Sequence, residues 1–371
     1  MKKFRAQQMN LQGWTGHLAA AEFLLAAVGA VVLFSASWYF ADTVFDDPFR
    51  IWRRQLIWML LGLLCAFGIS RMDKGWIRNL VPVLVWVSLA LNLMTFLPGI
   101  GYNAGGARRW VEIFGFTFQP SEVTRIALVL YLARMLEKNA ERLENFRDGL
   151  LPPLVVVVLL VLSVYFQNDF STAAYLLILA IAMFFAAGIP WAAVGITGAV
   201  AAVGAAVMVL AKPYRMKRVL SWFHPEADPS GAGFQLLKAR IALENGGLWG
   251  QGLGRGEMKR GGLPAAHSDF VCAVIGEEAG LLGIAAVLLL FTVFALNGWK
   301  RALDASDAFS RWTVFGLVTA VYWQVLINFS VVSGLLPATG IPLPLFSAGG
   351  SAAFVTIVMF GLINRFSGGA E

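Results

Sequence analysis

The stretch LPAAHSDFVCAVIGEEAGLLG, Leu263–Gly283, joins a polar segment of the chain to a long apolar one. The join itself carries His267, Ser268 and Asp269. Ionisable side chains at a membrane helix are energetically costly and mark functional positions by default. This stretch therefore predicts both a membrane helix and the place where polar chemistry meets it.

Composition extends that prediction to the whole chain. Its 371 residues are 58% hydrophobic and 14% charged, whereas soluble domains carry about 25% charged residues. A helix needs about 20 apolar residues to cross a bilayer. We therefore predict an all-α, polytopic membrane protein with ten transmembrane helices, at roughly 18–40, 55–70, 80–97, 120–136, 151–166, 171–188, 190–211, 270–297, 312–333 and 348–366.

The orientation follows from Lys and Arg, which concentrate in short cytoplasmic loops. An N-terminus in the cytoplasm places the larger share of these residues inside, among them Lys2, Lys3, Arg71, Lys74 and Arg134. Both termini are then cytoplasmic, and a large extracytoplasmic loop, 212–268, separates helices seven and eight. We predict that residues 1–371 form one transmembrane domain that contains this loop.

Two more carboxylates, Glu277 and Glu278, follow Asp269 within the apolar run. On a continuous helix of 1.5 Å rise, Glu277 lies about 12 Å beyond Asp269, and Glu278 points to the opposite side. No two of these three carboxylates can form the close pair of a retaining glycosidase from this helix alone. We predict that Asp269 is catalytic and that Glu277 and Glu278 are structural, paired with polar groups of neighbouring helices.

A second polar group surrounds the predicted fourth helix. Arg109 follows a glycine-rich bend, and its planar fork suits a phosphate. Pro120 fits the first turn of a helix, and Glu122 and Arg125 are three residues apart on one face. Two interpretations stay open: a local ion pair at the membrane edge, or a pair lining a polar, substrate-binding cavity.

The loop 212–268 is too long for a simple connection. It opens with PYRMKRVLSWFHP (213–225), whose Arg215 and Arg218 face lipid head groups or substrate phosphate rather than nucleic acid. AGFQLLKARIALENGG (232–247) predicts a short amphipathic helix at the interface. The glycines of GLWGQGLGRG (247–256) resemble a dinucleotide fingerprint, but no strand precedes them, and that interpretation is rejected.

The predicted ninth helix carries Gln324 and Asn328 on one face, four residues apart. They supply hydrogen bonds between helices, as structural residues, or line a cavity. The following segment, SGLLPATGIPLPLFSAGGSA (333–352), is rich in proline and glycine and includes Gly349 and Gly350 as structural positions. Non-helical backbone at membrane depth must be buried in protein or line a cavity, so we expect this segment to fold back against the outer cleft.

Taken together, these motifs resemble the SEDS family, the shape, elongation, division and sporulation proteins that include RodA, FtsW and SpoVE. The resemblance runs in order along nearly the whole chain, through GARRW (106–110), QPSEVTR (119–125), QNDFSTA (167–173), ADPSGAGFQ (227–235), GGLWGQGLGRG (246–256), AHSDFVCAVIGEEAGLLG (266–283) and LPATGIPLPLFSAGGS (336–351). Ser268 stands where Thr is usual, Arg125 where Lys is usual, and Ala348 where Tyr is frequent.

The resemblance implies a peptidoglycan glycosyltransferase that polymerises glycan strands from lipid II with a class B penicillin-binding protein as its partner. It matches Asp269 to the family's essential acid and Arg109, Glu122 and Arg125 to a polar cavity. Asp269 would be the general base, His267 and Ser268 would contact substrate, and Arg109, Arg125, Arg215 and Arg218 would bind the diphosphate of undecaprenyl diphosphate as it leaves. A divalent cation such as Mg²⁺ is compatible with this chemistry, but one acid at the join does not make a metal site by itself.

Two alternatives from other functional classes fit some of the same features. A lipid II transporter would also hold polar residues among its helices, although such proteins usually place broken helices at the midplane, and the ionisable residues here gather at the outer end. The second alternative is a scaffold protein with no enzymatic activity, which recruits the penicillin-binding protein. The segment GLGRGEMK (252–259) favours a division member of the family, whereas GGSA is similar to RodA.

Overall fold

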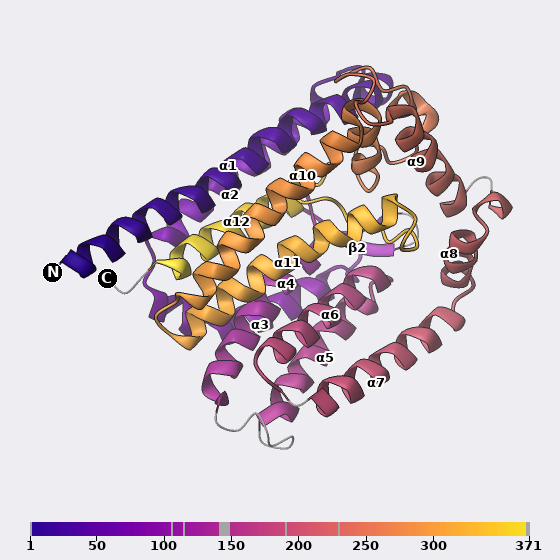
Figure 1. The fold of residues 1–371 in the computed structure, drawn as a ribbon. Helices are drawn as coiled ribbons and strands as arrows, with labels where there is room; N and C mark the ends of the chain where they lie inside the picture. Colours follow the sequence, from indigo (N-terminus) through magenta and orange to yellow (C-terminus); the bar gives the residue numbers. More distant parts are fainter. Residues whose placement is uncertain are drawn as a thin grey trace. The chain divides into compact units, whose positions relative to one another are not determined.

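The computed structural model describes residues 2–104, 107–113, 116–140, 149–189, 191–228 and 231–368. The chain is mainly helical (Figure 1). Its α-helices are α1 (Lys2–Phe45), α2 (Arg50–Ser70), α3 (Lys74–Met94), α4 (Pro120–Lys138), α5 (Leu151–Tyr165), α6 (Phe170–Ala186), α7 (Trp191–Leu210), α8 (Pro213–Phe223), α9 (Ala232–Gly246), α10 (Val271–Leu303), α11 (Ala308–Val332) and α12 (Gly350–Ser367). Short 3₁₀ and π turns lie at Pro225–Ala227 and Met258–Gly262.

Several of these helices can cross a bilayer. Among the described residues, six are long and apolar enough: α1 from His17, α2, α3, α10, α11 and α12. A seventh span is present if Gly198–Leu210 and Pro213–Phe223, which meet at a bend of 102°, cross the membrane as one broken span. The prediction of a polytopic membrane protein is confirmed, and the count of ten spans stays a prediction.

The all-α prediction was wrong for the segment before α4. Strands β1 (Gly101–Ala104), β2 (Ala107–Ile113) and β3 (Phe116–Phe118) form an antiparallel sheet in the order β1-β2-β3. Tyr102 pairs with Trp110, and Val111 pairs with Phe118. Aromatic and β-branched residues between glycines are typical of a β-hairpin. From the glycines alone we predicted only a bend. Gly105 and Gly106 lie outside the described residues.

The chain divides into two compact units, which we describe separately. Unit 1 comprises residues 1–60, 221–303 and 321–349, and unit 2 comprises 61–220, 304–320 and 350–371. In unit 1, α1 runs along α10 (Figure 1), and α9 packs on α10. The loop between α11 and α12, residues 333–349 and here called the C-terminal loop, packs on α1, because a Cβ on Gly29 would lie only 2.8 Å from the carbonyl oxygen of Leu345.

Helix α10 is broken at Gly280, which has φ +67° and ψ −168°, a conformation essentially restricted to glycine. The glycine-rich loop, residues 247–256, fills the break. The N–H groups of Gln251 and Gly252 donate to the carbonyls of Glu277 and Glu278, and the N–H groups of Leu281 and Leu282 donate to the carbonyls of Gly247 and Leu248. An unbroken helix would join these four α10 groups to one another, so the loop replaces the missing helical hydrogen bonds.

In unit 2, small polar side chains link α3, α4 and α5. The Ser88 hydroxyl donates to Thr124 Oγ1 at 2.9 Å, and Asn92 Nδ2 donates to Thr124 Oγ1 at 2.8 Å and to Ser163 Oγ at 2.9 Å. Gln167 Nε2 in turn donates to Asn92 Oδ1 at 2.9 Å. Such hydrogen bonds connect helices where lipid offers no hydrophobic driving force between them. They hold α4, which carries Glu122 and Arg125.

Candidate active site

Asp269 does not lie on a helix. Helix α10 begins at Val271, one residue after the start of the predicted span 270–297, so the continuous helix that we used to place Glu277 relative to Asp269 does not extend back to Asp269. The physical reason is that the carbonyl of Asp269 takes no part in the helical ladder, since the N–H of Ala273 donates to Phe270 instead. Asp269 is the last but one residue of a turn that precedes the helix.

Three consecutive carbonyls of this turn are held by other segments of unit 1. The N–H of Ala348 donates to the carbonyl of His267 at 2.7 Å. The Ser347 hydroxyl donates to the carbonyl of Ser268 at 2.5 Å, and Asn328 Nδ2 of α11 donates to the carbonyl of Asp269 at 2.9 Å. The backbone on both sides of the Asp269 side chain is therefore fixed by the C-terminal loop and α11.

The side chain of Asp269 is half-buried. Gly340 of the C-terminal loop has a φ of +74°, and a Cβ added there would lie 3.4 Å from Asp269 Oδ2, an ordinary van der Waals distance. The C-terminal loop therefore lies next to the carboxylate, and the positive φ is what favours glycine at this position.

His267 lies next to this carboxylate in sequence but packs as an aromatic ring. It stacks on Phe40 of α1, with ring centroids 4.4 Å apart. Burial lowers the pKa of His267 below its ordinary value, because a buried imidazole loses the hydration that stabilises its charged form. The hydroxyl of the neighbouring Ser268 donates within its own turn, to the carbonyl of Ala265 at 3.3 Å.

Glu277 and Glu278, predicted as structural, both anchor the chain that precedes the turn. Glu277 is fully buried and accepts hydrogen bonds from the N–H groups of Glu257 and Met258. Glu278 accepts a hydrogen bond from the Ser35 hydroxyl at 2.6 Å and forms an ion pair with Lys259. The two carboxylates point to different partners and fix the segment 257–259 against α1 and α10.

In unit 2, Glu122 and Arg125 form the ion pair expected from their spacing. Arg125 Nη2 lies 2.6 Å from Glu122 Oε2, and the side chains are only 4% and 10% exposed. Arg125 also hydrogen-bonds the hydroxyl of Tyr175 on α6, and that hydroxyl donates to the carbonyl of Ala320 at 2.6 Å. The guanidinium is thus held in a fixed orientation by two side chains.

Arg109 of β2 contacts the link between α5 and α6. Its Nη2 donates to the carbonyl of Asn168 at 2.7 Å, and its Nε lies 3.8 Å from Asp169. Asp169 caps α6 by accepting from the N–H of Thr172, and it also accepts from Gln119 Nε2 at 3.2 Å. Arg109 and Gln119, the residue just before α4, thus meet at the carboxylate of Asp169.

The two arginines of α8 differ. Arg215 is 4% exposed and donates to the hydroxyls of Tyr165 and Tyr214 and to the carbonyl of Met208. It also lies over the rings of Tyr165 and Phe170, at 4.9 and 5.1 Å. Arg215 thus contacts α5, α6 and α7. Arg218 is exposed.

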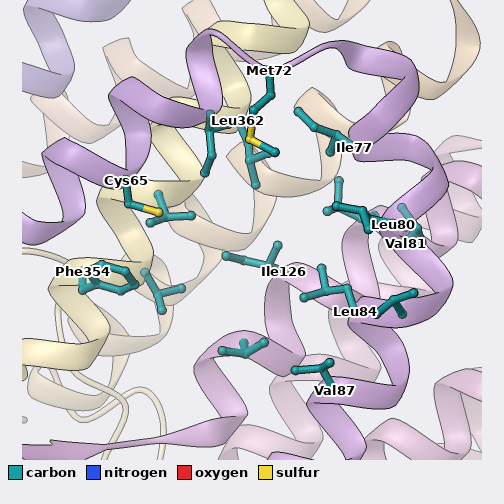
Figure 2. A pocket seen from close by; sticks show the side chains of 16 residues that line it. Cys65, Met72, Ile77, Leu80, Val81, Leu84, Val87, Ile126, Phe354 and Leu362 are labelled. Carbon is teal, nitrogen blue, oxygen red and sulfur yellow. The ribbon is translucent and has the colours of Figure 1, made fainter.

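Unit 2 also contains an apolar cavity of about 350 Å³. Figure 2 shows side chains from four helices pointing into a common space, among them Cys65 of α2, Leu84 of α3, Ile126 of α4 and Phe354 of α12. No charged side chain lines it among the described residues. A hydrocarbon chain is the kind of ligand that fits such a lining.

Among the residues that the structure describes, no three His, Cys, Asp or Glu side chains come together as ligands for a metal ion. The predicted site residues therefore supply no assembled set of ligands for the divalent cation considered from the sequence, and the mechanism below is derived without it.

Three contributors to this region were missed from the sequence. Lys259 completes the pair with Glu278, Ser347 holds the turn, and Gln55 of α2 holds Ser347. Gln55 Nε2 donates to the carbonyl of Ser347 at 3.2 Å, and its Oε1 accepts from the N–H of Gly349 at 3.2 Å. Gln55 directly follows Arg53 and Arg54, so its amide belongs to the polar start of α2 and gave no separate signal in the sequence.

The fold and these two groups of polar side chains describe a multi-pass membrane protein with an acidic turn and a buried ion pair between Arg125 and Glu122. The sequence model of the FtsW/RodA/SpoVE family, described as a cell cycle protein, matches residues 17–370. The chain belongs to this family.

Individual relatives agree with that assignment. The probable peptidoglycan glycosyltransferase FtsW of Geobacter sulfurreducens is 38% identical over 344 residues, covering 92% of each chain. Stage V sporulation protein E of Bacillus subtilis is 35% identical over 344 residues, covering 93% of this chain and 94% of the relative.

Solved structures show the same fold. One chain of a peptidoglycan synthase complex, in which polymerization and crosslinking are coordinated, has a TM-score of 0.77 and 27% identity, covering 96% of this chain and 97% of that one. The rod shape determining protein RodA of Thermus thermophilus has a TM-score of 0.69 and 25% identity, covering 96% and 95%.

Proposed function

We propose that the protein is a peptidoglycan glycosyltransferase that polymerises glycan strands from lipid II during elongation or division. The observation that carries the proposal is Asp269, a half-buried acid on a turn whose backbone is fixed at three carbonyls, in a chain related along its length to peptidoglycan glycosyltransferases. The site would lie on the extracytoplasmic side of the inner membrane, within a single domain of ten transmembrane helices with the loop 212–268 outside.

The reaction would be a glycosyl transfer with inversion. Asp269 removes the proton from the 4-hydroxyl of the acceptor GlcNAc, and that oxygen forms a bond to C1 of the donor MurNAc. The bond from C1 to the α-linked diphosphate breaks, and undecaprenyl diphosphate leaves with the electron pair. Diphosphate is a good leaving group, so the reaction needs a base but no second carboxylic acid.

Cationic side chains would stabilise the charge that develops on the diphosphate, because preorganised charges need no rearrangement during the reaction. Arg125 supports this role best, since Glu122 and Tyr175 already orient its guanidinium. Arg109 and the exposed Arg218 are further candidates, whereas Arg215 would contribute mainly by holding α8. The apolar cavity of unit 2 suits a polyprenyl tail.

The test is glycan polymerisation from lipid II by purified Asp269→Ala and Asp269→Asn proteins with a class B penicillin-binding protein present. Loss of a well-placed base should reduce the rate by about 10²–10⁴-fold. Full activity in either variant would reject Asp269 as the base. The assay is run in detergent, where no two compartments exist, so polymer formed there by the unaltered protein also excludes a function limited to transport.

The proposed partner is tested separately, by co-purification of the tagged chain. We expect a class B penicillin-binding protein to be retained on the column. If polymerisation by the chain alone equals that with every such partner, the partner assignment fails while the enzymatic one stands.

A further inference from the structure

We infer that Asn328, Ser347 and Gln55 form a backbone clamp that positions Asp269 for catalysis without touching the substrate. The inference rests on the proposed role of Asp269 as the base. It concerns three polar side chains that are 1%, 3% and 3% exposed and that come from α11, the C-terminal loop and α2.

Asn328 makes the most direct contact. Its Nδ2 donates to the carbonyl of Asp269 and to the carbonyl of Ile341, both at 2.9 Å. Its Oδ1 is buried and has no hydrogen-bond partner among the described residues. The opposite orientation of the amide would set Oδ1 against two carbonyl oxygens, so the two donations dictate the orientation. The side chain gives up an acceptor bond in order to join Asp269 to the C-terminal loop.

Ser347 joins the same two segments one residue earlier. Its hydroxyl donates to the carbonyl of Ser268 and accepts from the N–H of Leu343 at 2.8 Å. The N–H of Ala348 then holds the carbonyl of His267. Gln55 fixes this part of the C-terminal loop from α2, through the carbonyl of Ser347 and the N–H of Gly349.

The arrangement explains how a base can be accurately placed although it lies outside a helix. A turn residue has no helical hydrogen bonds to hold it, and a misplacement of about 1 Å can reduce a rate about 10²-fold. All three carbonyls from His267 to Asp269 are held, while the side chain of Asp269 stays half-buried. The clamp thus restrains the backbone and leaves the reacting group accessible.

The discriminating variant is Asn328→Asp, which preserves shape but replaces the donating NH₂ with an oxygen. Its matched control is Gln324→Glu, an equivalent change one turn away on α11. Gln324 Nε2 donates to the carbonyl of Pro342 at 2.8 Å, so the control disturbs the same helix and loop, but the bond that it removes is not to the turn 267–269.

We measure kcat and KM for lipid II, the pH dependence of kcat, and thermal unfolding, with the full chain and its penicillin-binding partner. Asn328→Asp should lower kcat by about 10–100-fold with KM nearly unchanged, the pattern of a lost transition-state interaction. It should also shift the acidic limb of the kcat profile, which reports the base. Gln324→Glu should keep the unaltered profile even where it lowers the unfolding temperature.

Ser347→Ala provides a second variant if Asn328→Asp does not fold, and it should show the same shift with a smaller loss of kcat. If Asn328→Asp and Gln324→Glu have equal effects and neither shifts the pH dependence of kcat, the three residues only stabilise the fold and do not position Asp269. If Asp269→Asn is inactive while Asn328→Asp and Ser347→Ala match the unaltered protein, the clamp proposal is wrong and the assignment of Asp269 as the base stands. If Asp269→Asn is active, the base assignment fails first.

Discussion

Lys259 and Glu278 form an ion pair whose side chains are 0% and 3% exposed. The Ser35 hydroxyl completes the group, because it donates to Glu278 and accepts from Lys259 Nζ at 3.0 Å. Two charges are thus compensated inside unit 1, at the point where the segment before the acidic turn crosses α1 and α10.

Replacement of Lys259 with Met should strongly destabilise the protein, because it leaves the Glu278 carboxylate buried and unpaired. Loss of one partner of a buried pair costs about 3–5 kcal/mol. The double variant Lys259→Met/Glu278→Met should be more stable than the single one, since no charge is stranded. Unfolding in detergent micelles measures both. A single variant as stable as the unaltered protein would contradict the ion pair.

Replacement of Arg125 should separate charge from geometry. Arg125→Ala removes the cation and strands Glu122, so polymerisation from lipid II should fall by at least about 10²-fold, as for loss of a preorganised electrostatic contact. Arg125→Lys keeps the charge and should be milder. Initial rates of glycan synthesis provide the measurement, and equal losses in the two variants would argue against a role based on charge.

The stability of the protein should decrease as the pH falls below about 6.5, in part through His267. Burial lowers the pKa of this imidazole, so the unfolded chain binds a proton at a pH where the folded one does not, and stability rises with pH across that window. His267→Gln should flatten this dependence in unfolding experiments between pH 5 and 8. The exposed His224 supplies the control, and a His224→Gln variant that flattened it equally would exclude His267 as the source.

The break in α10 should not tolerate a side chain at Gly280. A Cβ there would lie 2.4 Å from the carbonyl oxygen of Leu248, in backbone that favours glycine. Gly254 also has a positive φ, +80°, but no atom lies within 4 Å of an added Cβ. Gly254→Ala should therefore lose only about 1–2 kcal/mol of stability, the cost of placing alanine in left-handed backbone. Gly280→Ala should lose considerably more. Similar unfolding temperatures for the two would contradict the close approach of the glycine-rich loop to α10.

Hydropathy was sufficient to predict the class of protein and the positions of helices such as α3, α10 and α12, because a bilayer requires long apolar segments whatever their neighbours are. The spacing of Glu122 and Arg125 likewise predicted their ion pair, since residues three apart meet on any helix. These features depend on local sequence alone.

The rest depends on contacts between distant segments. Lys259 meets Glu278 only because the chain folds back between them, and no periodicity reveals such a pairing. The continuous helix from Asp269 to Glu277 was wrong because the carbonyl of Asp269 bonds to Asn328, 59 residues away, instead of to the helix. The small sheet was missed since its strands, of 4, 7 and 3 residues, are short and lie in a stretch whose glycines also fit an irregular bend.

The exchange of hydrogen-bond partners at Gly280 ties two segments of the chain into one opening event. The amides of Gln251 and Gly252 are protected only while α10 is in place, and those of Leu281 and Leu282 only while the glycine-rich loop is in place. All four should therefore exchange with deuterium at a common rate in solution, slow for a loop so rich in glycine. The glycine-rich loop and this part of α10 should therefore open as one cooperative unit.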